Sequence, residues 1–474
     1  MSVRKIGIRI LVSGLLSLAA QAATIPNLIQ QENAKPGTAS WVVTNPAKDH
    51  EIEGYASLAS VNRGDSISFF VNTIESTYAA DIYRMGWYGG KGARQMEHFG
   101  GLHGVKQPAP SVDYQTHLVQ CNWLEPIVLG IPATKSTEWI SGLYLVKLTA
   151  LRSRKQSYIT FVVRDDARAS DFLFQSSVAT YEAYNTWGGW SLYTNPQAYK
   201  VSFDRPFASG EGFGAPQIFS GAWEYSTIRF LEREGYDVSY TTDVDTHEQS
   251  APLLLHKGFL AVGHDEYWSW QMRNNVEGAR DHGVNLAFFG GDTAYWQIRF
   301  ESSTLTDAAD RVMVCYKDGK LDPLYNDRSR AYLTTTAFRN PPVNRPEAAM
   351  VGVAFGHGHG ANADMIITDA NSWVFAGTGL KNGDHLKGLV GYEADAVTAD
   401  SPKGIQVLAH SPYVLNQQKM YSDMATYRDA SGSLVVATGT MQWCWGLDEF
   451  PNWQYANPAA QQATRNILSS FQKH

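Results

Sequence analysis

The sequence has few cysteines and no long hydrophobic run beyond its first residues. Three of its 474 residues are cysteine, Cys121, Cys315 and Cys444, so at most one disulfide bond can form. Their spacing also excludes a structural zinc site built on cysteines. No later apolar stretch reaches the roughly 20 residues that span a bilayer, so a membrane anchor is not expected.

Positive charge is also scarce. The chain has 39 Lys and Arg against 46 Asp and Glu, a formal net charge of −7, and no basic stripe, which argues against nucleic acid binding. The glycine-rich segment 210–214 lacks a preceding strand and the dinucleotide spacing, so a nucleotide site is not expected. We expect a small-molecule or polymer substrate, no nucleic acid or membrane partner, and leave a homo-oligomer open.

No serine or cysteine stands where a hydrolase would carry its nucleophile. Residues 261–269 predict a strand that runs through a tight turn into a capped helix, yet Glu266 and Tyr267 occupy the turn. The pattern Gly-x-Ser-x-Gly is absent from the chain. A covalent mechanism is therefore disfavoured, and a glutaminase-like cysteine enzyme is the weakest alternative because Cys315 and Cys444 lie away from the turn.

The first residues predict a signal peptide. A basic start precedes the apolar run 10–20, and Ala20 and Ala22 supply the small residues that signal peptidase needs. We expect residues 1–22 to be removed after Ala22. The mature protein is then periplasmic or secreted by a bacterium.

Aromatic residues are present in excess. The chain has 14 Trp, 24 Tyr and 20 Phe, which together make 12% of its residues. With 44% hydrophobic and 18% charged residues it has the composition of a soluble globular protein. The aromatic surplus either fills the core or lines a surface that contacts a ligand.

The pattern of the chain changes near residue 165. Alternating segments at 61–73, 141–149 and 157–164 predict strands, and residues 23–165 are expected to form an Ig-like β-sandwich. From residue 166 to 474 strands alternate with helices, which predicts an α/β domain with a mostly parallel sheet. The predicted helices are 223–234 and 269–282, and the predicted strands are 171–178, 236–240, 258–262, 284–289 and 433–437.

Polar and aromatic side chains follow the predicted parallel strands. Ligands bind outside the carboxyl ends of such strands, so these side chains are expected to meet. The residues concerned are Tyr181, Tyr184, Asp243, Asp245, His264, Asp265, Glu266, Tyr267, Asp292 and Tyr295.

Each motif also has a structural interpretation. Glu266 could cap the helix dipole while His264 bonds the turn, and Tyr184 could serve as wall packing. A site of phenolate and carboxylate oxygens would instead suit ferric iron, which activates water as a Lewis acid. The segment 356–360, Gly-His-Gly-His-Gly, places two histidines on one face without a third ligand, so we expect a flexible exposed loop there.

Several motifs resemble the large (beta) subunit of N,N-dimethylformamidase and the relatives of its C-terminal domain. They follow the family's order over most of the mature chain. The matching segments are 82–94, 139–144, 184–189, 201–206, 263–268, 290–296, 391–393 and 439–445.

The resemblance implies an Ig-like domain followed by a domain similar to class I glutamine amidotransferases, with a mononuclear iron held by two tyrosines and one glutamate. Carried over by motif, the ligands are Tyr144, Tyr184 and Glu266, with Tyr181 as an alternative to Tyr184. His264 would orient Glu266 or the bound water. The site would then lie between the two domains.

Two positions depart from the family's pattern. The usual His-Pro-Glu-Tyr has Asp265 in place of proline, and the asparagine that follows Gly-Gly in the amidase is Asp292. An asparagine donates a hydrogen bond to a developing oxyanion, whereas an ionised aspartate repels it.

The sequence thus predicts an exported, iron-dependent hydrolase of a C–N bond, an amide, with a metal-activated water as nucleophile. His264, Asp292 and Glu393 would move protons. The alternative is a non-catalytic extracytoplasmic protein that binds a carbohydrate or another polymer through exposed aromatics. The expected pocket walls are Trp187, Tyr267, Trp268 and Trp443.

Overall fold

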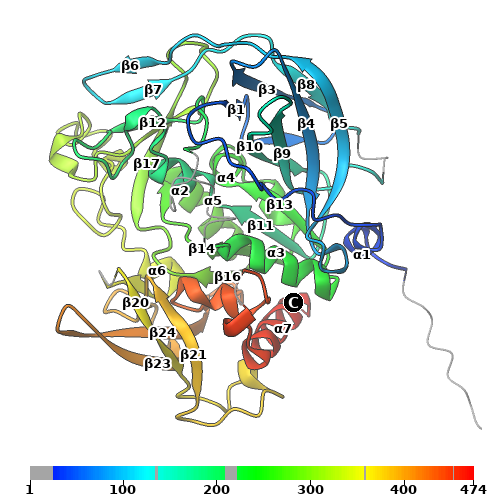
Figure 1. Cartoon of the computed structure of the whole chain (residues 1–474). Coiled ribbons are helices and arrows are strands. Elements are labelled where there is room, and N and C mark those ends of the chain that lie inside the picture. The colour runs from blue at the N-terminus through cyan, green and yellow to red at the C-terminus, as the bar shows by residue number, and fades with distance from the viewer. Residues whose placement is uncertain (1–24, 134–136, 209–220, 357–358, 452, 474) are drawn as a thin grey trace, which may run out of the picture.

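The computed structural model describes residues 25–133, 137–208, 221–356, 359–451 and 453–473 (Figure 1). The predicted signal peptide and the glycine-rich segment 210–214 lie outside the described residues. The chain is a mixed α/β protein in which strands predominate. Its three cysteines are free and buried. Within the described ranges, no helix is both long enough and apolar enough to cross a membrane.

Two sheets share one apolar core in the N-terminal part. Ile67 and Phe69 on the three-stranded sheet pack with Val146 and Phe161 on the five-stranded sheet, which makes a sandwich. The first sheet has the order β1 (Ile52–Ala56), β3 (Ser66–Thr73), β8 (Ile127–Gly130). The second has the order β2 (Ser60–Asn62), β10 (Gln156–Arg164), β9 (Gly142–Ala150), β4 (Thr77–Met85), β5 (Ala93–His103).

A seven-stranded sheet forms the centre of the C-terminal part. Its first five strands are parallel, and the last two extend it in antiparallel fashion toward the lower edge of Figure 1. The order is β13 (Val238–Thr242), β11 (Phe172–Ser176), β14 (Gly258–Gly263), β16 (Asn285–Gly290), β25 (Leu434–Ala437), β24 (Gln418–Arg428), β23 (Gln406–Leu415). The mostly parallel sheet matches the prediction; the antiparallel edge was not predicted.

Helices cover both faces of this sheet. Leu260 and Val262 of β14 share a core with helices α3 (Trp223–Glu234) and α7 (Pro458–Gln472). Phe259 and Ala261 point the other way and share a core with α5 (Trp270–Asp281) and α6 (Ala348–Val351). Alternate side chains of a strand face opposite sides, so both faces of β14 are apolar.

The local signals for the two predicted helices are present in the structure. Helix α3 ends at Gly235, which adopts φ 76° and caps the helix in the left-handed conformation. Helix α5 begins after Ser269, whose side chain accepts a hydrogen bond from the backbone N–H of Met272. Both helices lie where the sequence predicted them.

Smaller elements surround the carboxyl ends of the parallel strands. Helix α2 (Val178–Tyr184) follows β11, and a four-stranded sheet collects the segments after β14 and β16. That sheet has the order β12 (Lys200–Ser202), β18 (Val312–Val314), β17 (Trp296–Glu301), β15 (Tyr267–Ser269). Two short pairs complete this region, β20 (Ala361–Ile366) with β21 (His385–Tyr392) and β19 (Ala354–Phe355) with β22 (Asp395–Ala396).

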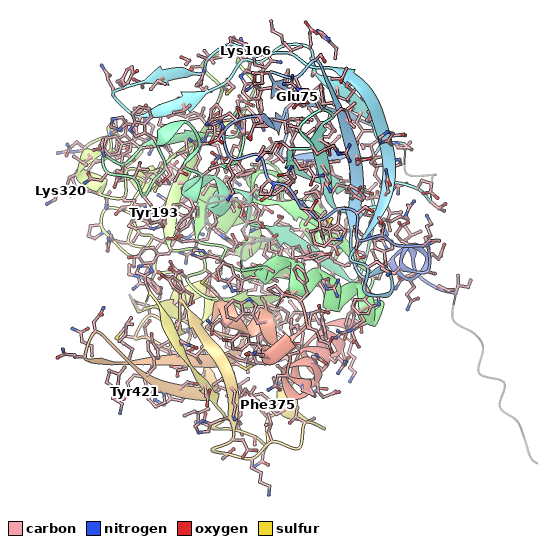
Figure 2. All side chains as sticks on the ribbon, viewed as in Figure 1. Glu75, Lys106, Tyr193, Lys320, Phe375 and Tyr421 are labelled. Carbon is pink, nitrogen blue, oxygen red and sulfur yellow. The ribbon has the colours of Figure 1, made fainter. Side chains whose placement is uncertain are left out.

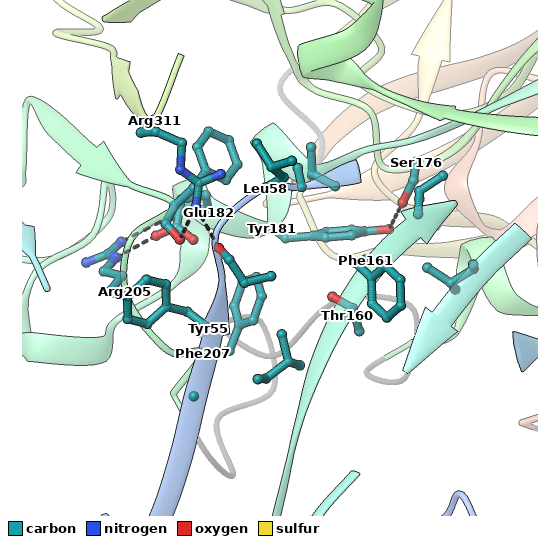
Figure 3. A pocket seen from close by; sticks show the side chains of 18 residues that line it. Tyr55, Leu58, Thr160, Phe161, Ser176, Tyr181, Glu182, Arg205, Phe207 and Arg311 are labelled. Carbon is teal, nitrogen blue, oxygen red and sulfur yellow. Dashed lines mark hydrogen bonds and ion pairs between the residues drawn. The ribbon is translucent and has the colours of Figure 1, made fainter. Parts of the chain in front are cut away.

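The sandwich and α2 enclose a narrow cavity (Figure 3). Phe161 of the sandwich and Tyr181 of α2 line it, and Glu182 forms an ion pair with Arg205 at 2.5 Å beside it. The cavity measures about 40 Å³, which is room for a few water molecules and is smaller than the pockets that bind small-molecule ligands.

Candidate metal and catalytic site

The tight turn after β14 places the central residues of the site. Gly263 adopts φ 68°, and the chain then presents His264 and Glu266 before β15 begins. The neighbouring strand β16 ends in Gly290, where a Cβ would lie 2.5 Å from the carbonyl oxygen of Gly263. Two glycines therefore let the carboxyl ends of β14 and β16 approach closely enough to bring Asp292 next to His264.

Two tyrosine hydroxyl groups converge on the carboxylate of Glu266. Tyr184, at the end of α2, donates to Oε2 at 3.0 Å, and Tyr193 lies 2.9 Å from Oε1. The two tyrosine rings stack with centroids 4.1 Å apart. Tyr267 donates to the hydroxyl oxygen of Tyr193 at 2.6 Å and so fixes its direction. Tyr193, labelled in Figure 2, has 44% of its surface exposed while its hydroxyl group is turned toward Glu266.

Burial keeps these phenols protonated in the absence of a cation. Burial raises the pKa of Tyr184 and of Tyr193 well above their ordinary values, and the charge of Glu266 adds to the effect. A cation at this place would offset both causes. Two phenol oxygens and one carboxylate therefore meet where a positive charge would favour the phenolate forms of the two tyrosines.

His264 lies between two buried carboxylates. Its Nε2 is 2.8 Å from Oε2 of Glu393 and 3.2 Å from Oε2 of Glu266. Burial alone would lower the pKa of His264, but Glu393 and Glu266 more than offset it and raise that pKa to about 10. The pKa of Glu393 falls to about 2, because His264 outweighs the effect of burial. The two side chains form an ion pair inside the protein.

Asp292 completes a cluster of ligand atoms. One ligand atom each of His264, Glu266 and Asp292 lies within 4.8 Å of the others. Both side-chain oxygens of Asp292 are buried without a hydrogen-bond partner among the described residues. Its backbone N–H donates to Asp395 at 2.8 Å. A buried, unpartnered carboxylate beside a second one is the feature that a bound cation would satisfy.

The pKa of Asp292 follows from this crowding. Burial raises it well above its ordinary value, and the charges of Glu393, Glu266 and Asp395 add to the effect. Burial also raises the pKa of Asp395 to about 7. Without a cation, burial and the neighbouring carboxylates therefore favour the protonated form of Asp292, whereas Glu393 stays ionised beside His264.

A lysine approaches the cluster from the segment after β18. Nζ of Lys317 is 3.3 Å from the centroid of the Tyr193 ring and 5.1 Å from that of Trp296. Burial lowers the pKa of Lys317, while Glu266 acts in the opposite direction. The ammonium group thus supplies positive charge over the face of the Tyr193 ring.

A pocket of about 260 Å³ opens onto these residues. This volume lies near the lower end of the range of small-molecule sites. The residues that line it are Tyr184, Tyr193, His264, His359, Tyr392, Glu393 and Met441.

The structure does not bring Tyr144 to Glu266. Tyr144 lies on β9 with its ring stacked on Trp139 in the sandwich core, and its hydroxyl donates to the carbonyl of Ile140 at 2.8 Å. The alternation of β9 turns this side chain into the sandwich. Tyr181, the alternative to Tyr184, contacts Ser176 in the buried interior. The second phenol at Glu266 is Tyr193, which lies in none of the motifs that predicted the site.

The predicted tryptophan walls also lie elsewhere. Trp268 donates to Oδ1 of Asp265 at 2.8 Å, and Trp443 donates to Oγ1 of Thr464 at 3.1 Å; both are buried in the core. Trp187 lines a different pocket. Among the four predicted wall residues, Tyr267 alone contacts the cluster, through Tyr193.

Four residues of the site were missed as candidates. Tyr193 and Lys317 lie in irregular segments whose sequence carries no periodic signal, and Asp395 stands two residues after Glu393. His359 belongs to the Gly-His-Gly-His-Gly segment that was expected to be an exposed loop, and residues 357 and 358 lie outside the described residues. His359 itself forms an ion pair with Glu393. Because His359 is far from Glu393 along the sequence, no local pattern predicts that the two side chains meet.

Comparisons with known proteins identify the family of this chain. A family model described as N,N-dimethylformamidase beta subunit-like, C-terminal, matches residues 79–458. The match includes all the site residues from Tyr184 to Asp395. A comparison with curated proteins gave no match. Because the family match covers most of the sequence, the chain belongs to the N,N-dimethylformamidase beta subunit-like, C-terminal family.

Proposed function

We propose that this protein is a metal-dependent hydrolase that cleaves the C–N bond of a small amide. One observation carries the proposal: two phenol groups converge on Glu266 beside the unpartnered buried carboxylate of Asp292. Membership of a dimethylformamidase-like family supports a hydrolase. The pocket volume favours a small substrate over a polymer.

The donor set fits ferric iron. Tyr184, Tyr193 and Glu266 would hold the ion, with Asp292 and His264 within reach of it. Phenolate and carboxylate oxygens are hard ligands that suit a hard, highly charged cation. When bound, the ion supplies Lewis acidity, which polarises the amide carbonyl and lowers the pKa of a water molecule.

Protein groups supply the remaining steps. His264, held between Glu393 and Glu266, orients Glu266 and keeps a proton on Nε2. Asp292 stands where the amidase has an asparagine, and its unpartnered carboxylate would add negative charge toward the bound cation.

The finer assignments belong to the same proposal. Residues 1–22 act as a signal peptide for export to the periplasm or the medium. The two-sheet core supports an Ig-like N-terminal domain over 23–165, and the sheet with helices on both faces supports an amidotransferase-like domain over 166–474. Neither assignment is needed for the chemistry of the site.

A second function is binding of a carbohydrate or another polymer without catalysis. The observation in its favour is a larger pocket of about 590 Å³ whose lining includes Trp123, Trp187 and Glu53, all three of them mostly buried. Nε1 of Trp187 donates to Oε2 of Glu53 at 2.7 Å. Such a pocket would bind a sugar in the absence of any metal.

One experiment separates the two functions. The protein is purified without chelators, analysed for metals and by absorption spectroscopy, and assayed for amine release from N,N-dimethylformamide and a panel of small N-alkyl formamides and acetamides. We expect bound iron, a visible absorption band and amine release. Glu266→Gln should lose iron and activity, whereas the exposed control Glu97→Gln should keep both. A colourless, metal-free and inactive wild-type protein would overturn the proposal.

A further inference from the structure

His359 pairs with a carboxylate at the edge of the catalytic pocket. Its Nδ1 lies 2.7 Å from Oε1 of Glu393, and the two form an ion pair when the imidazole is protonated. The side chain of His359 is 57% exposed, while that of Glu393 is 2% exposed. The imidazole ring also packs at 5.1 Å against Phe355 of β19. The exposed side chain of His359 therefore contacts the buried side chain of Glu393.

The other oxygen of the same carboxylate contacts a histidine in the interior. Oε2 of Glu393 lies 2.8 Å from Nε2 of His264, whose side chain is 4% exposed. Glu393 thus uses one oxygen for each histidine. The arrangement joins the pocket edge to the residue that contacts Glu266.

The orientation of the His359 ring follows from this contact. In the neutral imidazole Nδ1 donates to Glu393, which leaves Nε2 as a free acceptor. His359 lines the pocket, so Nε2 is the ring nitrogen available to a molecule bound there. A carboxylate that orients an imidazole in this way also makes it a better base.

We propose that His359 is the acid–base group that moves the proton during amide cleavage, with Glu393 as its positioning residue. The inference rests on the proposed hydrolase function. As the water oxygen bonds to the carbonyl carbon, the O–H bond breaks and its proton passes to Nε2 of His359. When the C–N bond breaks, its electron pair stays on nitrogen, and Nε2 returns the proton to that nitrogen. His359 ends in its starting state.

Charge around His359 supports this assignment. The hydrogen bond to Glu393 raises the pKa of His359, and burial acts against it. Of the other charged groups that face the imidazole, Glu266 raises that pKa and His264 lowers it. The contact with Glu393 therefore strengthens the imidazole as a base.

A matched pair of variants tests the assignment. His410 offers the control, because its Nδ1 lies 2.6 Å from Asp423, its side chain is 47% exposed, and it does not line the pocket. In the full-length, metal-loaded protein, His359→Ala should lower kcat for amine release about 100-fold with little change in KM. Added imidazole should restore part of kcat, and the pH profile should lose one limb. His410→Ala should match the wild type in all three respects.

A second measurement does not depend on turnover. Nitrogen NMR of the histidine rings should show His359 as the Nδ1–H tautomer, with a pKa that falls in Glu393→Gln. Retained kcat in His359→Ala, or no change of the His359 pKa in Glu393→Gln, would overturn the assignment while the hydrolase proposal stood. A wild-type protein that cleaves no amide would overturn the hydrolase proposal and this one with it.

Discussion

The ammonium group of Lys317 lies 3.3 Å from the centroid of the Tyr193 ring. Tyr193 also contacts Glu266, because its hydroxyl group at the ring edge lies 2.9 Å from Oε1 of that carboxylate. One tyrosine therefore contacts the lysine with its ring face and the carboxylate with its hydroxyl group. The charge of Glu266 favours the protonated form of Lys317.

Removing the charge of Lys317 should destabilise the metal-free protein. We expect Lys317→Met to lower the free energy of unfolding by about 2 kcal/mol, the value of a desolvated cation–π contact. The loss should be smaller after iron is added, because the iron then supplies positive charge. Urea unfolding with and without iron measures both values, with the half-exposed Lys257→Met as control. Equal losses in the two states would contradict this account.

The identity of the second phenol ligand can be tested by two matched variants. Tyr193→Phe removes the hydroxyl group next to Glu266 and should weaken iron binding at least tenfold and reduce the visible band. Tyr144→Phe removes a hydroxyl group that bonds Ile140 and should leave the band unchanged. Iron titration followed by absorption distinguishes them. The opposite result would assign the ligand to Tyr144.

Asp292 should make the metal-free protein sensitive to rising pH. Its folded-state pKa is raised, so the stability it contributes is present at low pH and is lost as the pH rises through that pKa. Asp292→Asn removes the ionisation and should raise Tm at neutral pH, with a smaller gain at pH 4. Thermal unfolding of the iron-free protein at both pH values checks this, with the exposed Asp400→Asn as control.

A buried ion pair joins the sandwich to the α/β part. Nη2 of Arg84 on β4 lies 2.7 Å from Oε1 of Glu232 on α3, and neither side chain is exposed. Removal of one partner leaves an uncompensated buried charge, so Arg84→Met or Glu232→Gln should lower the free energy of unfolding by about 3–5 kcal/mol. The exposed pair of Arg330 with Asp327 is the control, and Arg330→Met should cost less than about 1 kcal/mol. Chemical denaturation compares the three variants.

His256 should contribute to acid sensitivity. Burial lowers its pKa to about 4, against about 6.5 in the unfolded chain, and its Nδ1 lies 3.0 Å from the Ser170 carbonyl. Unfolding therefore takes up a proton between these pH values, and stability falls by about 3 kcal/mol as the pH drops from 6.5 to 4. His256→Asn should flatten this part of the curve. An unchanged slope would show that other groups carry the acid sensitivity.

Local signals predicted much of the fold. The helix at 223–234 and its end at Gly235 follow from apolar spacing and the left-handed preference of glycine, and Ser269 is the N-cap that starts α5. The parallel strands were found because their apolar runs alternate with helices. The antiparallel strands β23 and β24 were not predicted. They pair with each other, and β24 alone joins them to the parallel strands through its long-range pairing with β25.

The sequence by itself determined where the chemistry begins. A strand followed by a tight turn fixes His264 and Glu266 at the carboxyl end of β14, and a glycine pair after the next strand fixes Asp292 beside them. Only the tertiary structure decided which tyrosines reach Glu266. The packing of β9 turns Tyr144 into the sandwich, while an irregular loop returns Tyr193 to the site. Long-range packing sets the direction of a side chain, and sequence spacing alone does not encode it.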